Sequence, residues 1–397
     1  MPVRFRYGSF TLEEKRVRLA TAQGCPPLWV RLDRKIPYPV DQVRSITLLA
    51  EGARLFIKVT AEVPVATYPP GAEPDPDRTA LRSSNMRILV TGGAGFIGSH
   101  LTDAFVAGGD EVTVLDDLSR GRPGRLDPSI ALHKVSITDA PALRAVVESV
   151  RPELICHLAA QIDVRVSVDA PADDAVVNVV GTVNVLEAAR AVGARVLFAS
   201  TGGAIYGVDA PVPTSEDVLP GPEAPYGTAK YCAEQYLGLY NRLYGTRHAA
   251  LRLANVYGPR QDPAGEAGVV GIFCGRAFRG ERPTVFGDGH QTRDYVYVGD
   301  VADAFVAAAR TDRPGVWNVG TGHETSVREL IDLLGHASGR DLDPEYVPAR
   351  PGELQRSALA NDSAARDLGW TPRTTVADGL AAVYAWVADG SPDRAGR

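Results

Sequence analysis

The feature that most constrains the fold of this chain is a glycine-rich stretch between a predicted strand and a predicted helix. The stretch reads Gly92-Gly93-Ala94-Gly95-Phe96-Ile97-Gly98, a GxxGxxG pattern. It follows the apolar, β-branched run Arg87–Thr91 and precedes helical apolar spacing over Phe96–Ala107. Glycines at such a turn let backbone N–H groups approach a pyrophosphate at the helix N-terminus. The pattern predicts a dinucleotide site, although the string taken alone would also suit a tight turn that binds nothing.

An acid at the end of the next predicted strand narrows the choice of ligand. The strand predicted at 111–115 leads into Asp116, at the offset expected for the acid that hydrogen-bonds an adenosine ribose. A carboxylate there would repel the 2′-phosphate of NADP, so we expect NAD. Asp117 is included with the cofactor-binding residues, with a surface or capping role as its alternative.

Strand and helix signals alternate from Met86 onwards. Further strands are predicted at 131–135, 154–158, 195–199 and 248–253, and helices at 142–150, 174–192 and 226–244. Beyond 253 the pattern loosens into a helix near 269–279, strands near 284–286 and 295–298, and two C-terminal helices. This order predicts an α/β chain with a Rossmann-type doubly wound parallel sheet and a smaller α/β substrate lobe.

The N-terminal region differs from the rest. Residues 1–60 contain eleven Lys/Arg and five Asp/Glu, a net charge of about +6. Since the whole chain has a net charge of −6, the remainder carries about −12. Leu55–Val63 alternates with period two, as Trp29–Leu32 does in part, and Glu51-Gly52 suits a hairpin turn. A Pro-rich polar stretch follows. The expected division is a β-rich segment of unclear role at 1–67, a linker at 68–85, a mainly NAD-binding domain at 86–253, a mainly substrate-binding lobe at 254–390 that interleaves with it, and a tail at 391–397.

The sequence PYGTAK places Tyr226 and Lys230 four residues apart. On a helix the two side chains share one face. A phenol titrates near pH 10 and is a poor base at neutral pH, but a nearby ammonium and a positive nicotinamide would lower its pKa. The pair therefore predicts acid–base chemistry downstream of a cofactor site, with an ordinary surface helix as the alternative.

Ten motifs together identify the chain, from Met86 to about Val387, as similar to the extended short-chain dehydrogenase/reductase family, and most closely to the bacterial UDP-glucose 4-epimerases. They are TGGAGFIGSHL, LDDLSRG, HLAAQ, NVVGTVNVLEAA, STGGAIYG, YGTAK, RLANVYGPRQDP, VFGDGHQTRDYVYVGDVADA, WNVGTG and RPGELQRS. The resemblance implies that bound NAD takes a hydride from carbon 4 of a nucleotide sugar while Tyr226 takes the hydroxyl proton. The 4-keto sugar then turns over and the hydride returns to its other face.

The resemblance also assigns further residues. Lys230 tunes Tyr226, and Thr201 supplies the catalytic hydroxyl, with Ser200 or a water as alternatives because the usual Ser/Thr position falls on Gly202. The cofactor-binding set is Gly92, Gly95, Phe96, Ile97, Gly98, Asp116, Asp117, Ile137, Leu158, Ala159, Ala160, Tyr226 and Lys230. The substrate-binding set is Asn255, Arg293, Arg350, Glu353 and Ser357. Ser136 replaces an Asp that the family generally has near the adenine.

The residues after Thr201 weigh against sister reactions. Related dehydratases carry an Asp-Glu pair there and related decarboxylases a Glu, whereas this chain has Gly202 and Gly203. The predicted function is 4-epimerisation of UDP-glucose and UDP-galactose, extending to the N-acetylated pair, in galactose metabolism. The alternative is another nucleotide-sugar-modifying member of the family, such as a UDP-glucuronate epimerase, a dehydratase or a reductase.

The cellular compartment and the binding partners are predicted from less specific features of the sequence. The four scattered cysteines predict reduced thiols in the cytoplasm, and no metal-ligand spacing or uninterrupted apolar run of membrane-spanning length is present in the sequence. The expected partners are the nucleotide sugar and a second copy of the chain. A minor alternative, nucleic acid binding, rests on residues 1–85, which weakly resemble a fragment of transposon OrfB-type nucleases without its catalytic acids. We predict that residues 1–85 contribute nothing to the chemistry.

Overall fold

The computed structural model describes the backbone of six strands between residues 3 and 61, followed by residues 85–262, 268–349 and 354–390. The chain divides into two compact units, Met1–Thr79 and Ala80–Arg397. Each unit is described by itself.

The N-terminal unit contains two three-stranded antiparallel sheets, in the orders β1-β5-β6 and β2-β3-β4. Its strands are β1 (Val3–Arg6), β2 (Phe10–Glu13), β3 (Arg16–Leu19), β4 (Leu28–Arg31), β5 (Val43–Glu51) and β6 (Arg54–Ala61). Glu51 pairs with Arg54, so β5 and β6 form the hairpin that the sequence predicts at this point. The expectation of a β-rich segment is confirmed.

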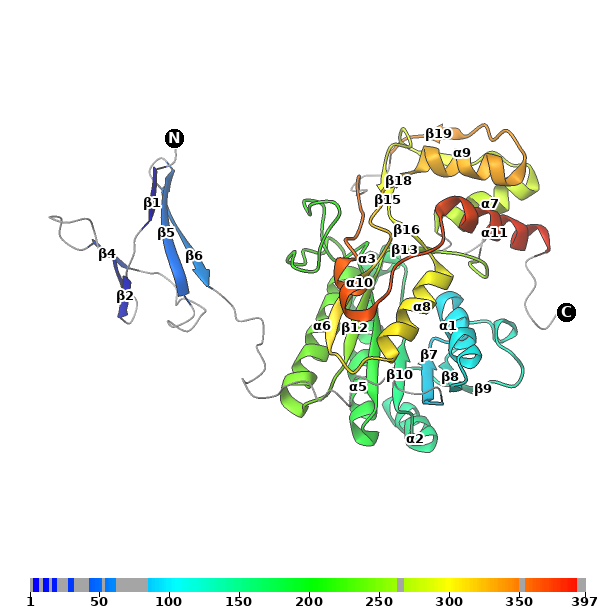
Figure 1. The fold of residues 1–397 in the computed structure, drawn as a ribbon, viewed down its shortest axis with the longest axis horizontal. Helices are drawn as coiled ribbons and strands as arrows, with labels where there is room; N and C mark the ends of the chain where they lie inside the picture. The colour runs from blue at the N-terminus through cyan, green and yellow to red at the C-terminus, as the bar shows by residue number, and fades with distance from the viewer. Residues whose placement is uncertain are drawn as a thin grey trace. The chain divides into compact units, whose positions relative to one another are not determined.

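The Ala80–Arg397 unit is built on a seven-stranded sheet whose neighbouring strands are all parallel (Figure 1). In spatial order the strands are β17 (Gly315–Val319), β12 (Ala249–Leu253), β11 (Arg195–Thr201), β10 (Leu154–His157), β7 (Arg87–Thr91), β8 (Glu111–Asp116) and β9 (Ala131–Lys134). The chain winds in one direction from β7 to β9 and then in the other from β10 onwards. The reversal between β7 and β10 creates a crevice at the carboxyl ends of the strands, where such sheets bind ligands.

Helices cover both faces of the sheet, and each face has its own apolar core. On one face lie α1 (Phe96–Ala107) and α8 (Val298–Ala309), which share a core that includes Phe105 and Phe305. On the other lie α2 (Ala140–Val150), α5 (Gly181–Val192) and α6 (Pro225–Tyr244), which pack around Leu143, Leu186 and Leu237. The predicted Rossmann-type fold is therefore confirmed.

A smaller lobe with a third apolar core follows the sheet. Its elements are the strand pairs β13 (Asn255–Tyr257) with β16 (Tyr295–Tyr297), β14 (Thr284–Phe286) with β19 (Glu345–Val347) and β15 (Thr292–Arg293) with β18 (Thr325–Ser326), and the helices α7 (Val269–Arg279), α9 (Val327–Ser338) and α11 (Val376–Ala388). The unit also contains three short α-helices: α3 (Val164–Asp169), α4 (Pro171–Ala175) and α10 (Asp362–Leu368).

Two elements of the second half were not predicted from the sequence. Val298 was expected to end a strand but begins α8, and β17 follows it as the seventh strand of the main sheet. Both belong to the nucleotide-binding layer although they lie beyond residue 253. They were missed because a buried strand and a buried helix have similar local apolar patterns. The helix predicted at 174–192 begins earlier, at α4, and a π-helical turn at Val176–Val180 joins α4 to α5.

One helical stretch in the described part of the chain, Pro171–Val192, is long and apolar enough to cross a membrane, with a mean hydropathy of 1.4. Its C-terminal half contributes Val185, Leu186 and Ala189 to the core beneath the sheet. One side of the stretch therefore packs in the core of the α/β layer, while Val176 and Val180 on it are exposed.

Candidate active site

The glycine-rich turn connects β7 to α1 and leaves no room for side chains. Gly92 has a φ of +71°, and a Cβ added there would lie 2.6 Å from the backbone nitrogen of Ala159. A Cβ on Gly98 would lie 2.2 Å from the carbonyl oxygen of Gly92. Within the described residues no side chain caps α1 at Gly95, and its first turn, which begins with Phe96 and Ile97, has no acid. The N–H groups and the positive end of the helix dipole can therefore meet an anion.

Asp116, at the end of β8, organises the same turn. Its two carboxylate oxygens accept hydrogen bonds from the backbone N–H groups of Ala94 at 3.0 Å and Leu118 at 2.9 Å. Burial raises the pKa of Asp116, and the two backbone hydrogen bonds lower it. Asp117 is exposed, and its carboxylate accepts a hydrogen bond from the Ser119 hydroxyl at 2.6 Å, a contact within the local turn.

The remaining residues predicted to hold the cofactor lie along the same edge of the sheet. Leu158, Ala159 and Ala160 directly follow β10, and Ala159 contacts the glycine turn. Ile137 is buried near the end of β9, where a Cβ added to Gly181 would lie 2.7 Å from Ile137 Cδ1. The structure thus gathers residues from three loops around one crevice.

The three side chains predicted as catalytic come together at the end of β11. The Tyr226 phenol is hydrogen-bonded to the Thr201 side chain. Burial raises the pKa of Tyr226 to about 12, while the Thr201 hydrogen bond acts to lower it. Lys230 Nζ lies 6.0 Å from the centroid of the Tyr226 ring and donates to the carbonyl oxygen of Ala199 at 2.9 Å. Burial lowers the pKa of Lys230 to about 8, opposed by the negative charges of Asp174 and Glu234.

Ser200, the alternative to Thr201, is engaged elsewhere. Its hydroxyl donates to Glu234 Oε1 at 2.5 Å, and the residue is 4% exposed. Glu234 in turn forms a buried ion pair with Arg252, in which Arg252 Nη2 lies 2.7 Å from Glu234 Oε2. Of the two hydroxyls, that of Thr201 is paired with the Tyr226 phenol and that of Ser200 with Glu234.

The two glycines after Thr201 have different surroundings. A Cβ on Gly202 would lie 2.3 Å from Leu359 Cδ1, so the Leu359 side chain occupies the space that an acid would need. A Cβ on Gly203 would lie 3.4 Å from Asn255 Oδ1, an ordinary contact. With glycine at both positions, neither of the two acids that a dehydratase requires is present, and the space beside Gly202 is filled by Leu359.

The residues predicted to bind the substrate are only partly described. Asn255 is exposed at the start of β13, and its side chain lies beside Gly203. Arg293 is half-buried in β15 and donates to the carbonyl oxygen of Thr292 at 2.8 Å. Ser357 is 9% exposed. Arg350 and Glu353 lie outside the described residues.

One buried acid that the sequence analysis missed connects these parts. The Asp294 carboxylate accepts from the backbone N–H groups of Thr321 and Leu359, at 2.8 and 3.1 Å from its nearer oxygens, and the Asp294 carbonyl accepts from Asn255 N–H at 2.9 Å. Its position beside Arg293 was the available sequence signal. Asp294 thus fastens the Leu359 segment over Gly202 and next to Asn255.

Comparisons with known proteins agree with this geometry. The sequence profile of the NAD dependent epimerase/dehydratase family matches residues 88–320. The UDP-glucose 4-epimerase of Mycolicibacterium smegmatis is 49% identical over 303 residues, which are 75% of this chain and 96% of that protein.

Two solved structures are similar in fold and sequence. The UDP-glucose 4-epimerase of Thermotoga maritima, solved with UDP-glucose, has a TM-score of 0.75 and 44% identity, covering 78% of this chain and all of that one. The Thermus thermophilus UDP-glucose 4-epimerase, in complex with NAD, has a TM-score of 0.71 and 42% identity, covering 76% of this chain and 98% of that one. The crevice, the glycine turn and these matches lead to one conclusion: the chain belongs to the NAD-dependent epimerase/dehydratase family.

Proposed function

We propose that the chain is an NAD-dependent 4-epimerase of UDP-hexoses that interconverts UDP-glucose and UDP-galactose. The observation that carries this proposal is the set of Tyr226, Thr201 and Lys230 at the carboxyl edge of the sheet, with glycine where dehydratases have acids. Epimerisation needs one proton acceptor and a bound oxidant, and no further acid. The names of relatives at 44–49% identity support the same reaction.

The chain's own residues suit NAD. The first N–H groups of α1, which no described side chain caps, can meet a pyrophosphate, and the Asp116 carboxylate at the end of β8 disfavours a 2′-phosphate. When bound, NAD supplies the oxidant that removes hydride from carbon 4 of the sugar and returns it to the opposite face. Lys230 and the loops after β9 and β10 are the residues we assign to holding it.

Tyr226 is the proposed base and, on the return step, the acid. With a pKa of about 12 the buried phenol remains protonated at neutral pH in the protein alone. The Lys230 ammonium stabilises the phenolate that must form, and Thr201 donates a hydrogen bond to it. Once the phenol has lost its own proton to solvent, the phenolate accepts the proton of the sugar 4-hydroxyl and later gives it back, so each turnover is proton-neutral.

The nucleotide-sugar side is assigned to the smaller lobe. Arg293 and Arg350 are proposed to hold the diphosphate, Glu353 the ribose, and Asn255 the sugar, with Ser357 bordering the 2-substituent. Arginine suits a diphosphate because its planar guanidinium can make two parallel hydrogen bonds. The small Ser357 side chain leaves space for an N-acetyl group.

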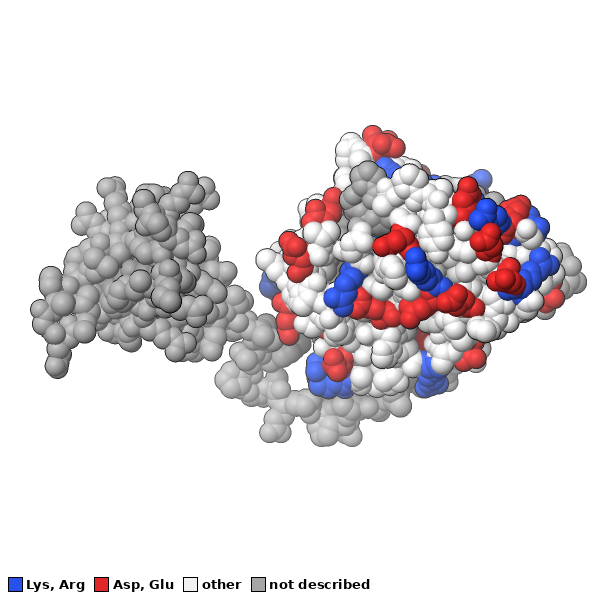
Figure 2. Space-filling model, turned by 90° about the horizontal axis from the view of Figure 1, so that it is seen from above, with Lys and Arg blue, Asp and Glu red and all other residues white. Residues whose placement is uncertain are grey.

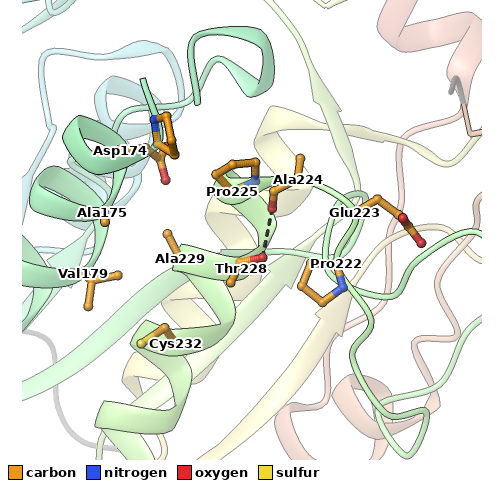
Figure 3. Close-up of a pocket in the computed structure, with 11 residues that line it drawn as sticks. Asp174, Ala175, Val179, Pro222, Glu223, Ala224, Pro225, Thr228, Ala229 and Cys232 are labelled. Carbon is orange, nitrogen blue, oxygen red and sulfur yellow. Dashed lines mark hydrogen bonds between the residues drawn. The ribbon is translucent and has the colours of Figure 1, made fainter. Parts of the chain in front are cut away.

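A homodimer is the proposed assembly, formed through the apolar side of the helical stretch from α3 to α6. Val168, Val176 and Val180 are 59%, 47% and 50% exposed. A cavity of about 530 Å³ lies between α4 and α6 (Figure 3), lined by residues that include Pro171, Asp174, Ala175, Val179, Pro225, Ala229 and Cys232. Exposed apolar patches of this kind mark protein interfaces, and a second copy would cover this one. Cytoplasmic location, and a role in galactose metabolism, complete the proposal.

Nucleic acid binding remains the second candidate, for the N-terminal unit only. The basic excess of residues 1–60 is the observation that favours it. Basic and acidic side chains are interspersed on the face of the Ala80–Arg397 unit in Figure 2, which does not resemble the contiguous basic surface that nucleic acid requires.

The decisive experiment incubates the purified full chain with UDP-glucose, without added cofactor, and identifies the products. We expect UDP-galactose to form, and denatured protein to release NAD. A keto-deoxy sugar would instead indicate dehydration, and release of NADP would contradict the role given to Asp116.

A further inference from the structure

Helix α6 meets the end of β11 through three contacts at regular spacing. Tyr226, Lys230 and Glu234 are each four residues apart on one side of α6. They contact three consecutive residues of β11: the Thr201 side chain, the Ala199 carbonyl and the Ser200 hydroxyl, respectively. The first two contacts involve the proposed catalytic residues, and the third involves groups to which the mechanism gives no task.

The third contact is the most enclosed. Ser200 is 4% and Glu234 6% exposed, and the hydrogen bond between them is 2.5 Å long. Arg252 binds the same carboxylate with two hydrogen bonds, Nε to Oε1 at 3.0 Å and Nη2 to Oε2 at 2.7 Å. Both Glu234 oxygens are therefore occupied, and Arg252 contributes two charge-assisted hydrogen bonds to them.

Arg252 extends this contact towards the substrate lobe. Its Nη1 donates to the Tyr206 hydroxyl at 2.8 Å, and that hydroxyl donates to Asn318 Oδ1 at 2.7 Å. Asn318 Nδ2 donates to the carbonyl oxygen of Ala360 at 3.2 Å. Ala360 follows Leu359, whose side chain lies over Gly202. A continuous, largely buried chain of hydrogen bonds thus joins α6 and β11 to the segment that carries Leu359.

We infer that Glu234 is a positioning residue, which acts through Ser200 to hold the end of β11 so that Thr201 meets the Tyr226 phenol. This inference rests on the proposed epimerase function. Strand β11 ends at Thr201, where its backbone pairs with β12, and an anchored Ser200 side chain further limits how the strand end can shift and rotate the Thr201 side chain. Glu234 provides that fixed point on the same helix that carries Tyr226. Because a misplacement of about 1 Å can slow an enzyme about a hundredfold, loss of this contact would reduce turnover without removing any reacting group.

The test compares Ser200→Ala with Glu234→Gln and with the double variant. Ser200→Ala removes the hydrogen bond and leaves the buried ion pair intact. Tyr240→Phe is the matched control. It also removes a hydroxyl–carboxylate hydrogen bond of α6, the one of 2.6 Å from Tyr240 to Glu187. Tyr240 lies about 21 Å along α6 from Tyr226, at 1.5 Å per residue. The measurements are kcat and KM for UDP-glucose, the pH profile of kcat, and the melting temperature.

We expect Ser200→Ala to lower kcat at least about tenfold with KM little changed, and to shift the pH limb assigned to Tyr226 upwards. Tyr240→Phe should lower only the melting temperature. The double variant should be no slower than the slower single variant, because both changes break one connection. If Glu234→Gln does not fold because Arg252 loses its partner, Ser200→Ala decides alone.

Unchanged kcat and pH profile in Ser200→Ala, with a melting temperature lowered as in the control, would overturn the inference. So would a fully additive loss in the double variant. Should the wild-type chain epimerise no UDP-hexose, the proposed function fails separately. The positioning role is then tested by ultraviolet titration of the Tyr226 phenol, with Tyr226→Phe subtracted, in which Ser200→Ala should raise the titration midpoint.

Discussion

Replacing Tyr226 with Phe tests the centre of the mechanism. The change removes one hydroxyl, which the structure buries against Thr201 and 6.0 Å, measured at the ring centroid, from the Lys230 ammonium. A positioned acid–base group contributes about 10²–10⁴ in rate, so turnover should fall at least about a hundredfold, or ~2.7 kcal/mol of transition-state stabilisation at ~1.36 kcal/mol per factor of ten.

The same change should leave the fold nearly unaffected. Thr201 loses one hydrogen-bond partner, a net cost of about 1 kcal/mol, and the cost of burying the phenol disappears with it. We expect the melting temperature to move by no more than about 2–4 °C. NAD should remain bound, because the glycine turn and Asp116 do not contact Tyr226 through any described hydrogen bond.

The assay follows conversion of UDP-glucose to UDP-galactose and measures the NAD released on denaturation. Tyr236→Phe, which removes a hydroxyl from the same helix, is the matched control and should keep wild-type turnover. Near-normal turnover in Tyr226→Phe would remove this residue from the mechanism. Loss of NAD in that variant would show that the slower reaction has another cause.

Four further outcomes are expected. Burial lowers the pKa of Lys230 to about 8, so kcat should fall above about pH 8 as the ammonium is lost. Between pH 8 and the ordinary lysine pKa of 10.5, Lys230 binds a proton in the unfolded chain but not in the folded one, so its contribution to the free energy of unfolding should rise with pH. Unfolding experiments on Lys230→Met should lack this rise. We assign the small Ser357 side chain to the position that borders the 2-substituent of the sugar, so the chain should epimerise UDP-N-acetylglucosamine, and Ser357→Tyr should lose that substrate while keeping UDP-glucose. Failure of the wild-type chain on the acetylated sugar contradicts this reasoning. Met86–Arg397 alone should fold, bind NAD and epimerise, because it lies within the compact Ala80–Arg397 unit. In the full chain the Met86 backbone nitrogen lies 3.0 Å from the Asp110 carboxylate, and the new terminal ammonium would keep this contact. Loss of any of these properties would assign the preceding residues to the enzyme.

Features that depend on neighbours in the sequence could be predicted from the sequence by itself. The glycine turn, Asp116 and the Tyr226–Lys230 pair are set by a strand–turn–helix order and by a spacing of four residues on a helix. Such patterns fix which backbone turns are sterically allowed and which side chains share a helix face. These features can therefore be predicted without knowledge of the fold. The parallel sheet followed from the alternation of strands and helices for the same reason.

Only the tertiary structure decided which partners these residues have. Thr201 and Ser200 are adjacent and chemically alike, and the sequence left the choice open; the structure turns one towards Tyr226 and the other into the Glu234–Arg252 pair. Leu359 blocks the space at Gly202 from more than 150 residues away. Contacts of this kind depend on how distant segments pack against each other, and no local periodicity records them.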